Sequence, residues 1–246
     1  MAESPAEQVQ TEVEKDAWAR ISEEFDEWAE QGKGEGMAES HAFLGMAIAQ
    51  ELPAGGKDTV LDLSCGAGWF SRYLAKEVVP DGQVIGVDLS PKMLEAAKTA
   101  SEGIVNLRFE VARAEELPFE DHSIDHIVNI ESFYYYPDQV AAGHEMFRVL
   151  KPGGTFFVAM DFFLENRHTH RWTDLMEVPM QCMGTDQYNT LFRACGFIDV
   201  GDQRIRDSAE LPEKADGKWF RTMEQLRGFR EEGSLLISGR KPPEEL

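Results

Sequence analysis

The stretch Asp62–Ser71, DLSCGAGWFS, decides the fold. It follows the apolar run Thr59-Val60-Leu61 and leads into a segment in which apolar residues recur at helical spacing. Gly66 and Gly68 stand one residue apart between a buried strand and a helix, where glycine lets the backbone approach a ligand closely. The stretch therefore predicts a strand-to-helix turn that holds a nucleotide-type ligand at the edge of an open α/β sheet.

Strand and helix patterns alternate on both sides of this turn. Short apolar runs predict strands at 60–63, 84–87, 107–111, 124–130, 155–160, 197–204 and 234–240. Helical spacing predicts helices at 69–78, 92–100, 139–150 and 186–195. Strands that alternate with helices are joined by right-handed crossovers. We therefore expect a Rossmann-like, mainly parallel seven-stranded sheet flanked by helices.

The segments outside this alternation predict a helical cover and a cap. Residues 17–30 place large apolar side chains at helical spacing, and residues 39–52 form a second helix after a glycine-rich break at 31–37. Residues 1–16 are polar and acidic, which is typical of a mobile arm. Residues 161–184 interrupt the alternation after the fifth strand and predict an inserted cap or lid.

Composition limits the class of protein. The 246 residues carry a formal charge of −21 and are 42% hydrophobic, enough for one core, so residues 17–246 are expected to form a single domain. The acidity fits a solvated surface or a salt-adapted host, and the lack of a Lys/Arg cluster disfavours nucleic acid as a partner. No apolar run reaches the ~18 residues of a membrane span. The three cysteines show no paired spacing, and no secretory signal is present, which favours a cytoplasmic location.

Acidic residues near the turn narrow the choice of ligand. Asp62 lies four residues before the first glycine of the turn, and a carboxylate there suits an ammonium group and repels a pyrophosphate. Asp88 ends the second strand, where an acid can accept hydrogen bonds from both ribose hydroxyls. Ala114 and Glu115 follow the third strand, where they can meet an adenine edge. These features together describe an adenosyl amino acid.

A dinucleotide is the competing ligand. Its fingerprint reads GxGxxG, and the third position here is Ser71, so the match is partial. No Lys follows at P-loop spacing, which disfavours ATP and GTP. An NAD(P)-dependent oxidoreductase on a Rossmann sheet therefore stays the alternative enzyme class.

Four motifs resemble one family. They are VLDLSCGAG (60–68), VIGVDLSPKMLEAA (84–97), ARAEELPFEDHSIDHIV (112–128) and FRVLKPGGTFFV (147–158). The chain resembles the class I S-adenosylmethionine-dependent methyltransferases, of the branch similar to the ubiquinone/menaquinone biosynthesis C-methyltransferases. The resemblance implies methyl transfer from S-adenosylmethionine to a small-molecule acceptor by in-line displacement, with S-adenosylhomocysteine as the product.

The resemblance also implies a set of cofactor-binding residues. They are Asp62, Ser64, Cys65, Gly66, Gly68, Asp88, Leu89, Met93, Ala114, Glu115 and Asn129. Within this set, Asp62 would lie against the methionine part, Asp88 against the ribose and Glu115 against the adenine. Asn129, in the fourth strand motif, would line the methyl end.

The acceptor site is expected beyond the ends of strands four and five. Relatives often carry His just after the fourth strand, whereas this chain has Tyr134 and Tyr135 within three consecutive tyrosines. Three consecutive tyrosines are not expected to point inward together, and we expect Tyr134 or Tyr135 to face the methyl group. His41 and His168 are further candidate bases or substrate contacts. His168 and His170 lack an obvious third ligand, so no metal is expected.

Three further points stay open. The aromatic and Met-rich cap favours an apolar or aromatic acceptor, or a small metabolite with an amine. Phe25 and Trp28 either close over the cofactor or only fix their helix to the core. A non-catalytic cofactor-binding protein and a protein substrate are the remaining alternatives, and the chain is expected to be a monomer or a homodimer.

Overall fold

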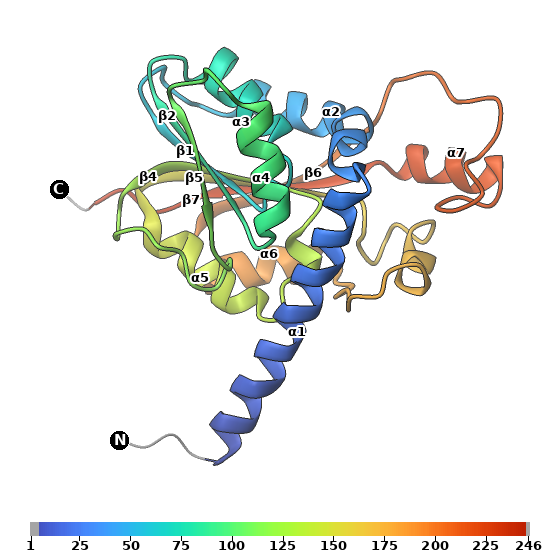
Figure 1. The fold of residues 1–246 in the computed structure, drawn as a ribbon, viewed down its shortest axis with the longest axis horizontal. Helices are drawn as coiled ribbons and strands as arrows, with labels where there is room; N and C mark the ends of the chain where they lie inside the picture. Colours follow the sequence, from blue (N-terminus) through green and yellow to red (C-terminus); the bar gives the residue numbers. More distant parts are fainter. Residues whose placement is uncertain (1–4, 245–246) are drawn as a thin grey trace.

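The computed structural model describes residues 5–244, with side chains for 17–32 and 40–244, and one sheet runs through it in the order β3-β2-β1-β4-β5-β7-β6 (Figure 1). The strands are β1 (Thr59–Leu63), β2 (Gln83–Asp88), β3 (Leu107–Val111), β4 (Ile124–Ile130), β5 (Leu150–Met160), β6 (Ile198–Ile205) and β7 (Ser234–Arg240). Strands β1 to β5 pair in parallel, and β7 is antiparallel to both β5 and β6. The predicted mainly parallel, seven-stranded Rossmann-like sheet is confirmed.

Seven α-helices flank the sheet within the described residues. They are α1 (Pro5–Glu30), α2 (Lys33–Glu51), α3 (Trp69–Tyr73), α4 (Pro91–Ala100), α5 (Gln139–Val149), α6 (Thr185–Ala194) and α7 (Met223–Glu232). The Ser90 hydroxyl starts α4 by accepting the Met93 N–H at 3.0 Å, and Pro91 occupies the first helical position. The end of the helix predicted at 69–78 is a π turn, Leu74–Val78, directly after α3.

Apolar side chains pack on both faces of the sheet. On one face, Leu44 and Ile48 of α2 and Phe70 of α3 pack with strand residues such as Val60 in one core cluster. On the other face, α5 and α6 pack against the alternate residues of the same strands, which include Leu61. The alternation of Val60 and Leu61 between the two clusters follows from the two-residue period of a strand.

The N-terminal region differs from the prediction. Helix α1 already starts at Pro5, so residues 5–16 of the expected arm are helical; their mobility and the domain boundary at residue 17 stay predictions. Helix α2 starts at Lys33, well before the predicted residue 39. One glycine explains the short break: Gly32 adopts a φ of 67°, a left-handed conformation that suffices to turn the chain between two helices.

Two other boundaries also moved. Strand β5 starts at Leu150, because Leu150 pairs with Ile124 across a β-bulge before the regular register begins at Thr155. The long connection between β6 and β7 contains helix α7, which the sequence analysis did not predict.

The covering segments gather at one end of the sheet. Figure 1 shows α1, α2, the segment 161–184 and α7 beside one another at this end, and residues from all four line one cavity. No helix within residues 5–244 combines the length and the apolar character that crossing a bilayer requires. The end of the sheet covered in this way contains the candidate active site.

Candidate active site

The glycine turn after β1 has a left-handed backbone at three positions. Ser64, Gly66 and Gly68 have φ values of 59°, 52° and 74°. A Cβ on Gly66 would meet no described atom within 4 Å, whereas a Cβ on Gly68 would lie 2.8 Å from the Phe109 ring. Gly66 therefore leaves space on the pocket side of the turn, and Gly68 allows the turn to pack against β3 at the start of α3.

Asp88 holds this turn from the end of β2. Its Oδ2 accepts the Gly66 N–H at 2.8 Å and its Oδ1 accepts the Ser90 N–H at 2.9 Å. Burial raises the pKa of the Asp88 carboxyl, against the effect of these hydrogen bonds. The carboxylate is thus fixed in orientation at the mouth of the turn, with lone pairs left to accept hydrogen bonds from a ligand.

Asp62 is the second buried acid of the pocket. Its Oδ2 accepts a hydrogen bond from the Ser71 hydroxyl at 2.5 Å. The pKa of Asp62 is raised to about 7, mainly by burial and in smaller part by the charge of Asp88, against the effect of the Ser71 hydrogen bond. A positively charged group placed beside Asp62 would favour its ionised form, so the site suits a ligand with an ammonium group.

Helix α1 lies over this pocket. Trp18, Ile21 and Phe25 line it, and Asp26 of the same helix accepts a hydrogen bond from Ser90. The remaining cavity measures about 80 Å³, whereas sites for small molecules typically enclose ~300–1,000 Å³. Helix α1 thus narrows the pocket, and Phe25 and Trp28 also pack against the core, so closure over the cofactor stays a prediction.

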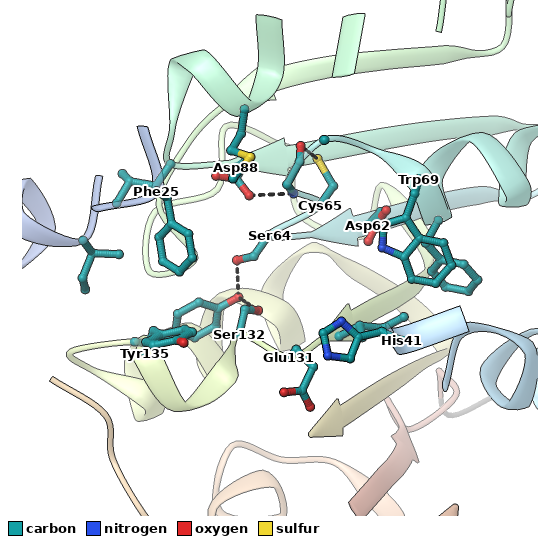
Figure 2. A pocket seen from close by; sticks show the side chains of 18 of the residues that line it. Phe25, His41, Asp62, Ser64, Cys65, Trp69, Asp88, Glu131, Ser132 and Tyr135 are labelled. Atoms are coloured by element: carbon teal, nitrogen blue, oxygen red, sulfur yellow. Dashed lines mark hydrogen bonds between the residues drawn. The ribbon is translucent and has the colours of Figure 1, made fainter. Parts of the chain in front are cut away.

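A second cavity of about 860 Å³, which we call the acceptor cavity, adjoins the first. Phe25, His41, Glu131 and Tyr135 line both cavities, and Figure 2 labels these four side chains among those that line the first cavity. We call these four residues the shared wall. Two ligands, one in each cavity, would meet there.

Glu131 was missed by the sequence analysis, although it follows directly after β4. Its φ of 57° is unusual for a residue with a side chain. Its Oε2 accepts the Tyr134 hydroxyl at 2.9 Å and its Oε1 accepts the Asp161 N–H. Burial raises the pKa of Glu131, and the negative charge of Asp161 adds to the effect. The sequence signal that could have identified Glu131 is an acidic residue directly after a predicted parallel strand.

Asp161 follows β5 and is also buried. Its Oδ1 accepts a hydrogen bond from Ser234, the first residue of β7. Burial raises the pKa of Asp161 to about 6. A ring nitrogen of His41 and one carboxylate oxygen each of Glu131 and Asp161 lie within 4.8 Å of one another. Three elements that are distant in sequence therefore place an imidazole and two carboxyl groups at the inner end of the acceptor cavity.

Most of the predicted cofactor residues lie around the first cavity. Those that line it are Asp62, Ser64, Cys65, Gly66, Asp88, Leu89 and Met93. Gly68, Ala114, Glu115 and Asn129 are not among the lining residues. Asn129 instead ties β4 to β1, because its Nδ2 donates to the Leu63 carbonyl and the Tyr136 hydroxyl, both at 2.8 Å. The Oε2 atom of Glu115 is buried without a hydrogen-bond partner among the described residues.

The predicted catalytic residues divide into three groups. His41 and Tyr135 line both cavities, Tyr134 lines only the acceptor cavity, and His168 lines neither. The His168 ring instead lies against α7, 2.3 Å from where a Cβ on Gly228 would be. All three consecutive tyrosines, 134 to 136, are buried, contrary to the expectation, because a 3-10 turn at Phe133–Tyr135 points them in different directions.

The roof of the acceptor cavity comes from two segments. The predicted cap at 161–184 supplies Trp172, Met176 and Met180, and the connection around α7 supplies a second set from Asp207 to Arg230. The Gln181 N–H donates to the Tyr134 carbonyl at 2.8 Å, which fixes the cap above the tyrosines. The contribution of the α7 connection was not predicted.

The sheet order and the acid-lined glycine turn define a Rossmann-like enzyme for an adenosyl ligand. Residues 61–158 match the family model of a methyltransferase domain. The methyltransferase solved in complex with the Haloferax volcanii Trm112 methyltransferase activator is 32% identical, with a TM-score of 0.82 over 89% of this chain and 98% of that chain. The chain belongs to the class I S-adenosylmethionine-dependent methyltransferases.

Two further relatives resemble the chain, one in sequence and one in fold. Demethylmenaquinone methyltransferase of Staphylococcus aureus is 29% identical over 187 residues, which cover 66% of this chain and 77% of that enzyme. Phosphoethanolamine N-methyltransferase 2 of Haemonchus contortus, solved with S-adenosylhomocysteine, is 19% identical over 81% of this chain and 52% of that chain. Its TM-score of 0.63 shows a shared fold. The predicted family, enzyme class and S-adenosylmethionine dependence are thus confirmed, and the oxidoreductase alternative is set aside.

Proposed function

We propose that this enzyme methylates a small molecule that binds in the acceptor cavity. The observation that carries the proposal is the shared wall, since Phe25, His41, Glu131 and Tyr135 line both cavities. A methyl donor in the first cavity and a nucleophile in the second would face each other across it. Such a geometry supports in-line displacement, which requires attacking and leaving atoms on opposite sides of the methyl carbon.

The residues of the first cavity suit the cofactor part by part. The Asp62 carboxylate would bind the ammonium group of the methionine part, and Asp88 would accept hydrogen bonds from the ribose hydroxyls. The open space beside Gly66 would let the ligand approach the main chain of the turn closely. Leu89 and Met93 would pack on the adenine. When bound, S-adenosylmethionine supplies a methyl group that its positive sulfur has already activated. Ala114, Glu115 and Asn129 stay predicted contacts.

The protein's own work is to position the reactants and to exclude water. Phe25 and Tyr135 present rings 5.3 Å apart at the shared wall, and aromatic rings there favour a positive charge. Burial raises the pKa of Tyr135 well above its usual range, so its hydroxyl stays protonated and is no base. His41 is the basic side chain of the wall, and we propose that it accepts the proton that an acceptor must lose.

The test combines binding and turnover. Calorimetric titration with S-adenosylmethionine and S-adenosylhomocysteine should show micromolar binding of both. Released S-adenosylhomocysteine should then increase with a small-molecule acceptor from a panel of phenols, quinols, thiols and amines. Methyl transfer only to a protein in a fractionated lysate, with no small molecule accepted, would refute the proposal.

A protein partner is also proposed, because a 32% identical relative was solved with an activator. Strand β3 is an edge of the sheet. Val105, just before it, is 97% exposed, and Val111, its last residue, is 54% exposed. An edge strand with exposed apolar residues can pair with a strand of another chain. Co-expression with a Trm112-type activator should yield a 1:1 complex by size-exclusion chromatography, where the chain alone runs as a monomer or homodimer. Substitution of Val111 with Asp should weaken that complex; an unchanged complex would place the interface elsewhere.

A further inference from the structure

We infer that the acceptor cavity recognises an organic cation, so that the methyl acceptor is an amine held by Glu131 and Asp161. The inference rests on the proposed function and names its substrate class. It depends on three features of the cavity: two buried acids that form no ion pair with Lys or Arg among the described residues, Lys and Arg side chains that are already engaged, and a wall rich in aromatic rings.

The two acids carry no countercharge from Lys or Arg. Glu131 is 6% exposed and Asp161 is 4% exposed. None of the ion pairs among the described residues includes either of them. A buried carboxylate is costly unless it is paired or hydrogen-bonded, and two neighbouring ones repel each other. A positive ligand between them would remove both penalties.

The Lys and Arg side chains of the cavity do not supply that charge. Arg230 forms an ion pair with Asp207 at 2.9 Å and donates to the Ala209 carbonyl at 2.5 Å. The Lys218 ammonium lies 4.6 Å above the Trp219 ring. Both are therefore engaged at the outer, α7 side of the cavity. Neither of them reaches the inner end at Glu131 and Asp161, where a bound cation would favour the ionised form of both acids.

Aromatic rings supply the rest of the recognition. The aromatic residues that line the cavity are Phe25, Trp28, Phe43, Tyr134, Tyr135, Trp172, Trp219, Phe220 and Phe229. The face of an aromatic ring attracts an organic cation through its quadrupole and packs against its carbon atoms. A metal ion at the same acids would gain nothing from these rings, so the whole wall favours an organic amine over a bare divalent cation.

The position of the acids connects recognition with chemistry. Glu131 lines both cavities, whereas Asp161 lines only the acceptor cavity, so the pair serves the acceptor and not the cofactor alone. An ammonium group bound there first loses a proton to His41. The lone pair of the neutral amine then forms the N–C bond while the S–C bond breaks and its electron pair goes to sulfur. The N-methylammonium product leaves with its charge still balanced by the two acids.

The test uses three phenyl-bearing probes of similar size and different charge. The protein saturated with S-adenosylhomocysteine is titrated calorimetrically with 2-phenylethylamine, 2-phenylethanol and phenylacetate. We expect the amine to bind at least tenfold more tightly than the alcohol, and phenylacetate not to bind. Asp161→Asn and Glu131→Gln should each lower the amine affinity at least tenfold and leave the alcohol affinity unchanged. Glu120→Gln, an exposed acid remote from the cavity, makes the same change in net charge and should alter neither.

Three outcomes would overturn the inference. One is equal or tighter binding of the alcohol, which would mark an apolar acceptor site. Another is 1:1 binding of Mn²⁺ that displaces the amine and disappears in His41→Ala, which would make the cluster a metal site. The third is turnover of a quinol or phenol with no amine accepted; the proposed function would then stand without the amine. Thermal unfolding of both acid variants confirms that a lost affinity is not lost folding.

Discussion

Asp26 of α1 accepts a hydrogen bond from the Ser90 hydroxyl at 2.5 Å, across 64 residues of sequence. The same hydroxyl accepts the Met93 N–H at 3.0 Å, and the Ser90 N–H donates to Asp88 at 2.9 Å. One serine therefore connects the covering helix, the start of α4 and the acid proposed to bind the ribose. Ser90 therefore couples the docking of α1 to the position of Asp88 in the cofactor pocket.

Asp26→Ala should therefore weaken cofactor binding, although Asp26 is not proposed to contact the cofactor itself. Loss of a hydrogen bond to a charged group costs ~1.5–3 kcal/mol, so the affinity for S-adenosylhomocysteine should fall about tenfold or more. Calorimetry measures the change. Glu23→Ala, an exposed acid on the same helix, is the control and should bind as the wild type does. Equal affinities of the two variants would show that α1 docks independently of the pocket.

Asp88→Ala should abolish measurable cofactor binding. The change removes the proposed ribose acceptor and leaves the N–H groups of Gly66 and Ser90 without their partner. Two charge-assisted hydrogen bonds to the ribose correspond to a loss of roughly a hundredfold or more in affinity. Equilibrium titration with S-adenosylhomocysteine and a thermal melt distinguish lost binding from lost folding. A folded variant with wild-type affinity would show that the ribose assignment is wrong.

Asp62→Asn should stabilise the protein and impair its function. The folded-state pKa of about 7 lies above the ordinary value of 3.8, so the folded protein binds the extra proton between these values and loses stability as pH rises through this window. The variant avoids that loss. Its melting temperature should therefore exceed that of the wild type, and the difference should be largest near neutral pH. Melts between about pH 5 and 8 check this, and a constant difference between the two proteins would contradict it.

The same acid predicts a pH-dependent affinity. An ammonium group binds the ionised carboxylate, so wild-type affinity for S-adenosylhomocysteine should rise between about pH 5.5 and 7.5 as Asp62 loses its proton. Asp62→Asn should bind at least tenfold more weakly at the upper end and lack most of this rise. Because Asp161 titrates nearby, with a pKa of about 6, only the difference between the two proteins isolates Asp62. A parallel pH profile in both would refute the ammonium assignment.

Tyr135 should act through its ring. The ring meets Phe25 edge to face at 5.3 Å, and burial keeps the hydroxyl protonated. Tyr135→Phe should therefore keep the turnover number within about threefold, whereas Tyr135→Leu should lose about tenfold because a cation–π contact is worth ~1–2 kcal/mol. Steady-state kinetics with an acceptor from the panel compares them. A Phe variant as slow as the Leu variant would assign the chemistry to the hydroxyl.

The parts of the site that follow from local pattern were predictable. The glycine turn, Asp62 and Asp88 lie at the carboxyl ends of β1 and β2, and parallel strands bring such ends to one edge. A short motif therefore placed two acids in one pocket. His41 was also predicted at this cavity, from its position on the helix before the first strand, and it lies in the shared wall.

The acceptor side depends on contacts that no local pattern encodes. Glu131 meets Asp161 because β4 pairs with β5, and its left-handed backbone turns the side chain inward. His168 packs on α7, so the two segments of the roof are joined by a contact between residues sixty positions apart. Residue types alone favoured the histidine and gave no weight to the glutamate.

Helix α1 also sets a limit on speed. The pocket beneath it measures only about 80 Å³ while Asp26 accepts the Ser90 hydroxyl, so we expect product to leave only when the helix undocks. Trp18 is 8% exposed, lines this pocket and lies 6.3 Å from Tyr136. The Trp18 indole should become exposed to solvent when the helix undocks. In a variant that keeps Trp18 as its only tryptophan, stopped-flow fluorescence is therefore expected to follow the opening of the helix directly.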